Sequence, residues 1–216
     1  MLKQIDWQPD VIHCNDWQTG LVPAYLKTIY KDDEVFNKFK TLFTIHSLAY
    51  QGLFPKSAFS KTRLPDELNS EKGIELNGKL NFLKSGLLYS DVINTVSETY
   101  ANEIRSDEEL GGSLKPVLAK RKNDLYGIVN GIDGRLWNPE KDKILPHKYS
   151  VKDLSGKEEN KKELAEKFGF KYNPETPIIG LISRLYDTKG IDLIADAFPE
   201  LMKMNIQLIL LGTGER

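Results

Sequence analysis

Short apolar segments rich in valine and isoleucine alternate along this chain with longer segments of helical periodicity, and this alternation constrains the fold more than any other feature. We expect strands at residues 11–13, 42–46, 92–96, 126–129, 178–182 and 207–211. Several of these segments are apolar at consecutive positions, which is typical of strands covered by helices on both faces. The chain is therefore predicted to be an α/β protein with parallel sheets.

The helices are predicted from apolar residues at helical spacing and from residues that favour helix ends. Leucines spaced four, three and four residues apart predict a helix across residues 76–87. Ser97 is suited to cap the next helix. Further helices are expected across residues 157–168, ended by Gly169, and across residues 191–201.

Two stretches interrupt the alternation and suggest how the chain is organised. Residues 54–73, with two prolines and scattered charges, are expected to form a long excursion between units. Residues 137–172 are highly charged and are expected to connect two domains. The chain opens on a strand and closes on a strand followed by a glycine turn, so both domains are expected to be truncated.

Composition argues against several classes of function. The formal net charge of −1 argues against attraction to nucleic acid or to an anionic membrane. A single cysteine, Cys14, excludes an internal disulfide and fits a reducing compartment. No signal peptide and no apolar run of the roughly 18–20 residues needed for a membrane helix are recognisable. We therefore expect a soluble, cytoplasmic protein, and we find no metal-ligand spacing, nucleophile elbow or Walker motif.

Two of the predicted strands end in a histidine that opens a polar loop. In open α/β sheets ligands lie beyond the carboxyl ends of the strands, so His13, Asp16 and His46 are placed for a cleft. Asp16 could accept hydrogen bonds from sugar hydroxyls or from a donor on a neighbouring loop. Its alternative role is to cap the helix that follows. His46 could bind a sugar hydroxyl, and its alternative role is that of a structural histidine; the repeated arrangement favours a site.

Asn130 and Gly131 follow the strand expected at residues 126–129. Asn-Gly favours a type I′ hairpin turn. The sequence after it supplies no partner strand, so a strand-end loop that faces the cleft is the preferred interpretation.

Residues 183–190 carry the clearest chemistry. They join a buried strand to a helix, which places Arg184 and Lys189 beside a helix N-terminus. Free N–H groups and the helix dipole favour phosphate there, arginine adds a bidentate fork and lysine a compact charge. Together they could neutralise a departing diphosphate without a metal. The alternative is an exposed basic loop that pairs with Asp187.

The ordered set of these segments resembles the glycogen/starch synthase family. The matching segments are PDVIHCNDW (9–17), TIHSLAYQG (44–52), NFLKSGL (81–87), TVS (95–97), NGID (130–133), WNP (137–139), SRL (183–185) and LGTG (211–214). Each segment alone is a weak signal, whereas their order across the whole chain is highly specific. The resemblance implies a GT-B-type fold with parts of two Rossmann-like domains, each with a parallel sheet, truncated at both ends.

The resemblance also implies domain boundaries. Residues 1–136 are expected to be the C-terminal part of the N-terminal, starch synthase catalytic domain. Residues 137–172 are expected to be the interdomain connector, and residues 173–216 the start of the C-terminal, nucleotide-sugar-binding domain.

The activity that the resemblance implies is retaining transfer of glucose from ADP-glucose to the non-reducing end of an α-1,4-glucan in glycogen biosynthesis. No metal and no bound cofactor are implied. The implied catalytic residues are His46 and Asp16, which line the glucose and the reaction centre, and Arg184 and Lys189, which hold the diphosphate. The implied substrate-binding residues are Asn130, His13, Gln51, Arg184 and Lys189.

The chain departs from the family pattern at two positions and lacks two of its loops. The family commonly has asparagine at the position of Ser47 and a second histidine at the position of Asn15. Its Lys-Thr-Gly-Gly-Leu and Glu-Pro-Cys-Gly loops, which contact the donor and the glucose, are absent. We therefore expect this chain alone to be an inactive fragment of the enzyme. The alternatives are a non-catalytic glucan- or nucleotide-binding remnant, one half of a split enzyme that needs a complementary chain, and a different GT-B glycosyltransferase, against which residues 50–52 argue.

Overall fold

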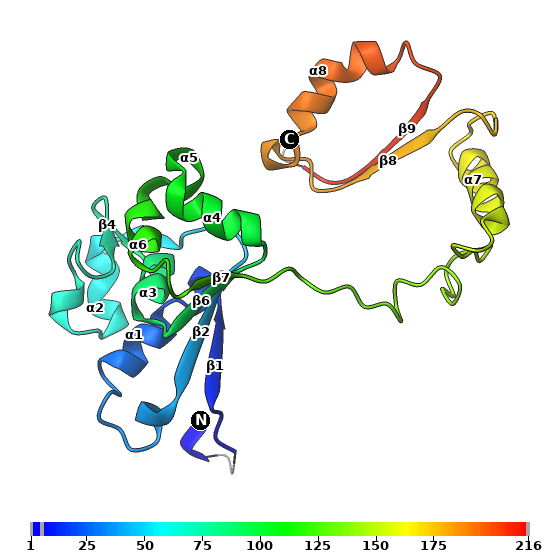
Figure 1. Ribbon diagram of the computed structural model, residues 1–216. Helices are drawn as coiled ribbons and strands as arrows, with labels where there is room; N and C mark the ends of the chain where they lie inside the picture. Colours follow the sequence, from blue (N-terminus) through cyan, green and yellow to red (C-terminus); the bar gives the residue numbers. More distant parts are fainter. Residues whose placement is uncertain (1, 5–6, 215–216) are drawn as a thin grey trace. The chain divides into compact units, whose positions relative to one another are not determined.

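The structure is a computed structural model that describes residues 2–4 and 7–214. The chain divides into two compact units, Met1–Gly131 and Ile132–Arg216 (Figure 1). Each unit is described by itself below.

The first unit is built on a four-stranded parallel sheet in the order β1-β2-β6-β7. Its strands are β1 (Val11–Asn15), β2 (Lys40–Ile45), β6 (Val92–Thr95) and β7 (Leu125–Gly127). In the register, Asn15 lies opposite Thr44, and Thr44 lies opposite Asn94. The parallel sheet expected from the sequence is confirmed, and the carboxyl ends of β1 and β2 meet at one edge.

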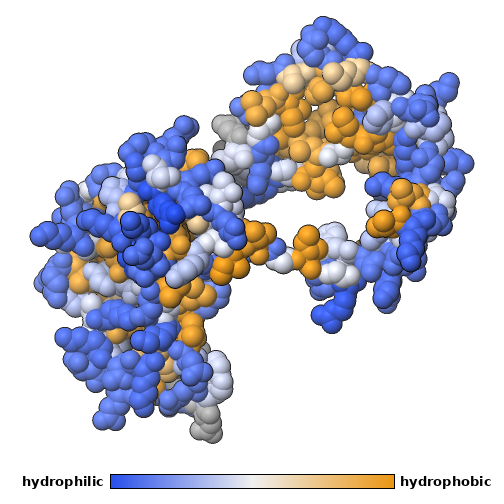
Figure 2. Space-filling view, viewed as in Figure 1, coloured by the Kyte–Doolittle hydropathy of each residue, from blue (hydrophilic) through white to orange (hydrophobic). Residues whose placement is uncertain are grey.

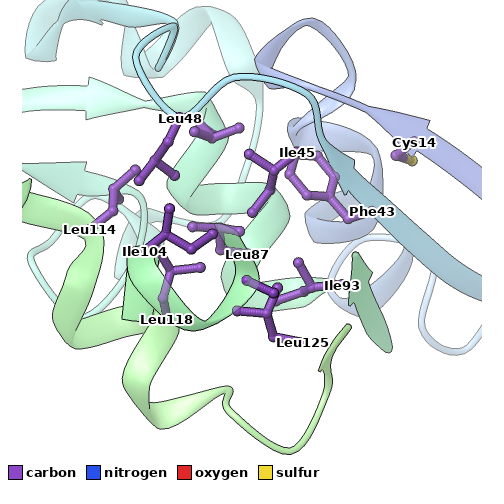
Figure 3. Close-up of a cluster of buried hydrophobic side chains, with 12 residues drawn as sticks. Cys14, Phe43, Ile45, Leu48, Leu87, Ile93, Ile104, Leu114, Leu118 and Leu125 are labelled. Carbon is purple, nitrogen blue, oxygen red and sulfur yellow. The ribbon is translucent and has the colours of Figure 1, made fainter. Parts of the chain in front are cut away.

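Helices cover one face of this sheet (Figure 1). They are α3 (Phe82–Tyr89), α4 (Glu98–Ser106) and α6 (Lys115–Lys120), and the unit also contains α1 (Leu21–Lys27) and α5 (Glu108–Gly111). Phe43 and Ile45 of β2 are fully buried against Leu87, Ile104 and Leu118 of the helices (Figure 3). Each such side chain contributes about 1.5–3 kcal/mol on burial, so this core holds the sheet and its helices together.

Part of the opposite face of the sheet is exposed within the described part of the chain, although Thr44 and Asn94 on this face are buried. Side chains alternate between the two faces of a strand, so Val11, Val92 and Tyr126 point away from the core and are 52%, 39% and 53% exposed. This sheet differs in that respect from most parallel sheets, which are covered on both faces.

Residues 54–73, expected to be an excursion, instead form part of a small folded module. A three-stranded antiparallel sheet, in the order β3-β5-β4, is made of β3 (Leu53–Pro55), β4 (Glu75–Leu76) and β5 (Lys79–Asn81). With helix α2 (Phe59–Thr62) it encloses a second apolar core that includes Phe59, Ile74 and Leu80. The expectation of a long loop was wrong, because its scattered apolar residues pack together.

A buried lysine of α3 ties this module to the rest of the unit. Lys84 is 3% exposed, and its ammonium group donates to the carbonyls of Glu71 and Glu75 at 2.6 Å each. Burial lowers the pKa of Lys84, although Glu71 and Glu75 act in the opposite direction.

The helix expected across residues 76–87 is only half correct. Asn77 and Gly78 have φ of 51° and 76°, the left-handed pair that a type I′ turn requires. They join β4 to β5 as a hairpin. Helix α3 begins only at Phe82, after the side chain of Asn81 accepts a hydrogen bond from the Lys84 N–H at 2.8 Å.

The other predicted helix ends are confirmed. Ser97 caps α4 by accepting from the Tyr100 N–H at 3.2 Å. Gly169, with φ of 71°, follows helix α7 (Ser155–Lys167). The Gly169 N–H bonds to the carbonyl of Glu166, and the Phe170 N–H to that of Ala165, which is the Schellman arrangement.

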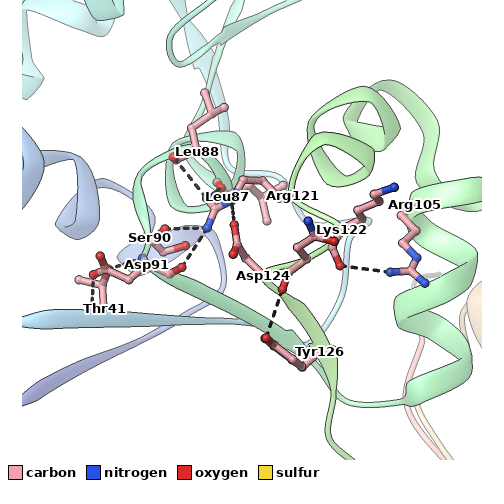
Figure 4. A network of polar contacts seen from close by, with 11 residues as sticks. Thr41, Leu87, Leu88, Ser90, Asp91, Arg105, Arg121, Lys122, Asp124 and Tyr126 are labelled. Carbon is pink, nitrogen blue, oxygen red and sulfur yellow. Dashed lines mark hydrogen bonds and ion pairs between the residues drawn. The ribbon is translucent and has the colours of Figure 1, made fainter.

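Arg121 closes the C-terminal end of α3 (Figure 4). Its guanidinium donates to the carbonyls of Leu87 at 2.6 Å, Ser90 at 2.9 Å and Asp91 at 3.1 Å, and pairs with Asp124 at 2.8 Å. The last carbonyls of a helix have no partner within it, so this side chain satisfies groups that would otherwise be buried without one.

Asp91, directly before β6, is held by β2 and α1. It accepts from the N–H and hydroxyl of Thr41 at 2.8 and 2.9 Å and pairs with Lys27 at 2.6 Å. Burial raises the pKa of this carboxyl, but the bonds from Lys27 and Thr41 outweigh that effect and the net pKa is lowered.

Asp91→Asn is expected to flatten the pH dependence of stability in acid. Because the folded-state pKa lies below the unfolded value of about 4, the ionised carboxylate stabilises the fold above that pH, and the contribution is lost as pH falls through the folded pKa. Urea unfolding at about pH 7 and pH 3 measures the difference. Asp32→Asn is the control, since the Asp32 side chain is 89% exposed. Equal pH dependence in wild type and Asp91→Asn would contradict the role of this carboxylate.

The second unit contains a strand–helix–strand segment. Strands β8 (Ile178–Ile182) and β9 (Gln207–Leu211) pair in parallel and have the ranges that the sequence predicted, and α8 (Ile191–Leu201) joins them. Apolar side chains of this segment are widely exposed (Figure 2): Ile182 is 80%, Leu193 69% and Leu211 60% exposed. The assignment of residues 137–172 as a connector stays a prediction.

Across residues 2–4 and 7–214, no helix has the length and apolar character needed to cross a membrane. Within the same described residues, no group of three or more His, Cys, Asp or Glu side chains is arranged to hold a metal ion.

Candidate active site at the carboxyl ends of the strands

Asp16 connects the ends of β1 and β2. Its carboxylate Oδ1 accepts from the backbone N–H of His46 at 2.8 Å, and its own N–H donates to the carbonyl of Thr44 at 2.9 Å. Its side chain makes no capping bond to the 3₁₀ turn Trp17–Thr19 that follows. The predicted bond to a donor on a neighbouring loop is therefore confirmed, and the helix-cap alternative is wrong.

The backbone of Asp16 is strained. Its φ of 53° and ψ of −174° fall in a region that is almost confined to glycine. A non-glycine residue there costs about 1–3 kcal/mol and persists only where its surroundings fix it. The two hydrogen bonds to β2 and its following loop provide that constraint, so the carboxylate is held in one position.

His46 lies exposed immediately after β2. Its Nε2 is 2.9 Å from Oδ1 of Asn15, the last residue of β1. The ring is therefore fixed at one nitrogen while it remains open to solvent, which fits a ligand-binding histidine better than a buried structural one.

His13 begins a row of polar side chains across three strands. Its Nε2 is 2.6 Å from the hydroxyl of Thr44 on β2, and that hydroxyl donates to Oδ1 of Asn94 on β6. Thr44 is 3% and Asn94 8% exposed, so the inner part of the row is buried. Asp16 and His46 are thus joined by a hydrogen bond, whereas His13 is bonded to Thr44; a shared ligand site for the three residues stays a prediction.

Gln51 lies on the loop after β2 and contacts the start of α3. Its side-chain oxygen accepts from the amide of Asn81 at 2.6 Å, and its carbonyl accepts from the Leu83 N–H at 3.0 Å. In this structure Gln51 positions α3, a role that sequence reasoning missed. Its substrate contact stays a prediction.

Two glycines allow the elements around the site to approach closely. A Cβ at Gly20, just before α1, would lie 1.9 Å from the carbonyl oxygen of Phe82 on α3. A Cβ at Gly52, whose φ is 63°, would lie 2.5 Å from the ring of Trp17. The close approaches at these two glycines are revealed only by the packing.

Cys14 lies on β1 between the site residues but faces the core. Burial raises the pKa of its thiol to about 11, although a hydrogen bond with Thr19 acts in the opposite direction. The thiolate, not the thiol, is the nucleophile, so Cys14 is a packing residue at neutral pH.

Asn130 lies exposed three residues beyond β7. Neither Asn130 nor Gly131 has a positive φ, and β7 pairs only with β6 among the described strands. The type I′ hairpin is therefore wrong, and a loop at the carboxyl end of the sheet is confirmed. Its contact with a sugar stays a prediction.

Arg184 and Lys189 belong to the second unit. Arg184 follows β8, and its guanidinium carbon lies 5.6 Å from the centre of the Tyr186 ring. Lys189 is followed by Gly190, with φ of 69°, at the N-cap of α8. Both side chains are exposed, and a helix N-terminus with adjacent cations suits phosphate. The alternative pairing involves the side chain of Asp187, which lies outside the described side chains.

The glycine turn after β9 supports the loop that carries Arg184. The Ser183 N–H donates to Leu211 at 3.1 Å and the Leu185 N–H to Thr213 at 2.8 Å. A Cβ at Gly212 would lie 2.0 Å from the carbonyl oxygen of Ser183. The turn therefore supports the loop that follows β8.

Comparison with known proteins shows which family the chain resembles. Residues 1–120 match the family described as the starch synthase catalytic domain. The glycogen synthases of Thermosipho africanus and Thermotoga maritima are 50% and 49% identical to this chain over 215 residues, which is 100% of this chain and 44% of each relative. The chain thus spans less than half the length of these relatives.

A solved structure shows the same fold. The catalytic domain of starch synthase IV from Arabidopsis thaliana, bound to ADP and acarbose, matches with a TM-score of 0.91 and 34% identity, over 100% of this chain and 44% of that one. The expected fold class, α/β of GT-B type with parts of two Rossmann-like domains, is confirmed. With more than half of its residues in the family match, this chain belongs to the starch synthase catalytic domain family.

Proposed function

We propose that these residues form part of a retaining glucosyltransferase that moves glucose from ADP-glucose to the non-reducing end of an α-1,4-glucan. The pairing of Asp16 with His46 at the ends of adjacent parallel strands carries the proposal, in a chain of this family. The starch synthase IV structure, bound to ADP and acarbose, supports a nucleotide and a glucan-like ligand in this fold.

Residues of the first unit are proposed to bind the sugar. His46 and His13 offer ring nitrogens to sugar hydroxyls, and the fixed carboxylate of Asp16 holds the loop that carries His46. Asn130 is proposed to contact the sugar from the end of β7, and Gln51 from the loop after β2. A preorganised pocket orients the anomeric carbon without reorganisation during the reaction.

Two cations of the second unit are proposed to act on the leaving group. As ADP departs, negative charge develops on its diphosphate. Arg184 and Lys189, beside the N-terminus of α8, are proposed to stabilise that charge. Retention then follows from attack on the face that the diphosphate leaves, with a phosphate oxygen taking the proton of the acceptor hydroxyl. No metal is required in this scheme.

A second candidate function is non-catalytic binding of glucan or nucleotide, either by a remnant or by one half of a split enzyme with a complementary chain. The 44% coverage of the relatives motivates it. We place either form in the cytoplasm, in keeping with the single buried cysteine.

The purified 216-residue chain is expected to incorporate no glucose from labelled ADP-glucose into glycogen, because two donor-contacting loops of the family are absent from its sequence. A full-length enzyme that contains these residues is expected to be active in the same assay. Robust turnover by the chain alone would contradict its expected inactivity. An inactive full-length protein that still binds glycogen would instead support the non-catalytic function.

A further inference from the structure

We propose that Asn15 is a positioning residue that fixes the imidazole of His46 in its Nε2–H tautomer. The Nδ1 of His46 is then a hydrogen-bond acceptor, available to a hydroxyl of the ligand. Only the link to glucosyl transfer rests on the proposed function, since the tautomer is a property of this chain by itself.

The hydrogen bond between the two side chains determines which nitrogen carries the proton. Nε2 of His46 lies 2.9 Å from Oδ1 of Asn15. An amide oxygen has lone pairs and no hydrogen, so the nitrogen that faces it must donate. A neutral imidazole has one N–H, and Nδ1 is therefore left with its lone pair.

Both partners are anchored through their backbones. The Asn15 N–H donates to the hydroxyl of Thr19 at 2.6 Å, and that hydroxyl donates to the Asn15 carbonyl at 2.8 Å. The His46 N–H donates to the Asp16 carboxylate at 2.8 Å. The two side chains thus start from fixed positions at the ends of neighbouring strands, which favours one ring orientation.

The tautomer of His13 can be assigned in the same way from its hydrogen bond to Thr44. The Thr44 hydroxyl donates its only hydrogen to Asn94, so it must accept from Nε2 of His13. In its neutral form, each of these two histidines therefore offers Nδ1 as an acceptor. Such a pair favours a ligand that brings hydroxyl donors, such as a sugar, and disfavours an anion, which has only lone pairs to present.

Nitrogen NMR of the histidine rings tests the proposal on the 216-residue chain without substrate. The chain has three histidines, so the ring signals can be assigned one by one. At about pH 8, His46 is expected to show a protonated Nε2 and an unprotonated Nδ1. Asn15→Leu is expected to move the His46 ring-nitrogen signals toward those of an unconstrained histidine, which exchanges between the two tautomers. The signals of His13 and His147 are expected to stay in place.

Asn15→Asp keeps an acceptor oxygen and is expected to preserve the Nε2–H of His46. Asn123→Asp is the matched control, because it adds the same charge at an exposed residue outside this site. Backbone amide spectra confirm that each variant is folded. A protonated Nδ1 in the wild type, or His46 signals that Asn15→Leu does not move, would overturn the proposal. Because the measurement involves no ADP-glucose, it can fail or succeed independently of the proposed glucosyl transfer.

Discussion

Replacement of Arg184 by alanine, in a full-length enzyme that contains these residues, is expected to lower kcat about 10²- to 10³-fold. Enzymes that lose one preorganised hydrogen-bond donor to the charge developing in the transition state lose about this much. Lys189 directly precedes the N-cap of α8, and Arg184 lies in the same loop after β8. Both are proposed to stabilise the negative charge of the departing diphosphate. Lys189→Ala is expected to act in the same direction. Because the diphosphate carries more negative charge in the transition state than in bound ADP-glucose, KM for ADP-glucose should change less than kcat.

Two further variants make this test specific. Arg184→Lys keeps the charge but loses the bidentate fork, so it should recover only part of the rate. Arg135→Ala removes an arginine of the same unit whose side chain is 98% exposed, and it should leave kcat unchanged. If Arg184→Ala and Lys189→Ala both had wild-type kcat, the leaving-group role of this loop would be wrong.

Gly20→Ala is expected to destabilise the first unit by about 3 kcal/mol or more, at the upper end of overpacking effects. Gly20 has an ordinary helical φ of −63°, and alanine in a helix is usually favourable. Here the added Cβ would lie 1.9 Å from the Phe82 carbonyl oxygen and 2.7 Å from its carbon. Both are backbone atoms, so α1 and α3 would have to move apart.

Urea unfolding of the 216-residue chain measures this effect, with Gly131→Ala as the control. A Cβ at Gly131 meets nothing within 4 Å, and its φ is not positive, so that change should be neutral or slightly stabilising. Equal midpoints for Gly20→Ala and Gly131→Ala would show that α1 and α3 can separate without cost.

The strands could be predicted because their consecutive apolar residues are needed for burial. β8 and β9 have the expected ranges. β2 ends at Ile45, one residue before the expected end, because the His46 N–H bonds to the Asp16 carboxylate instead of to a neighbouring strand. Such an ending depends on a side chain 30 residues away, which periodicity cannot reveal.

The helix expected across residues 76–87 shows how one periodicity can arise from two structures. Leu80 packs into the core of the small module, whereas Leu83 and Leu87 pack against the main sheet. Asn-Gly favours a hairpin turn at residues 130–131 as well, where a strand-end loop was the preferred interpretation, but the turn forms at residues 77–78. Only the second pair lies between two segments that can pair as antiparallel strands.

The contact between Asp16 and His46 could be predicted, since parallel strands end at one edge. The details of the site could not. The bond of Gln51 to Asn81 and the support of Arg184 by Gly212 each join residues about 30 apart in the sequence. Composition and spacing do not predict such contacts.

At Asp16 the fold is less stable than another residue would make it. At its φ and ψ, glycine would relieve about 1–3 kcal/mol of strain, while the carboxylate that holds the His46 loop would be lost. The most stable residue at this position and the residue that can serve a sugar pocket are therefore different. A search for thermostable variants would therefore select Asp16→Gly, and that substitution would disable the proposed site.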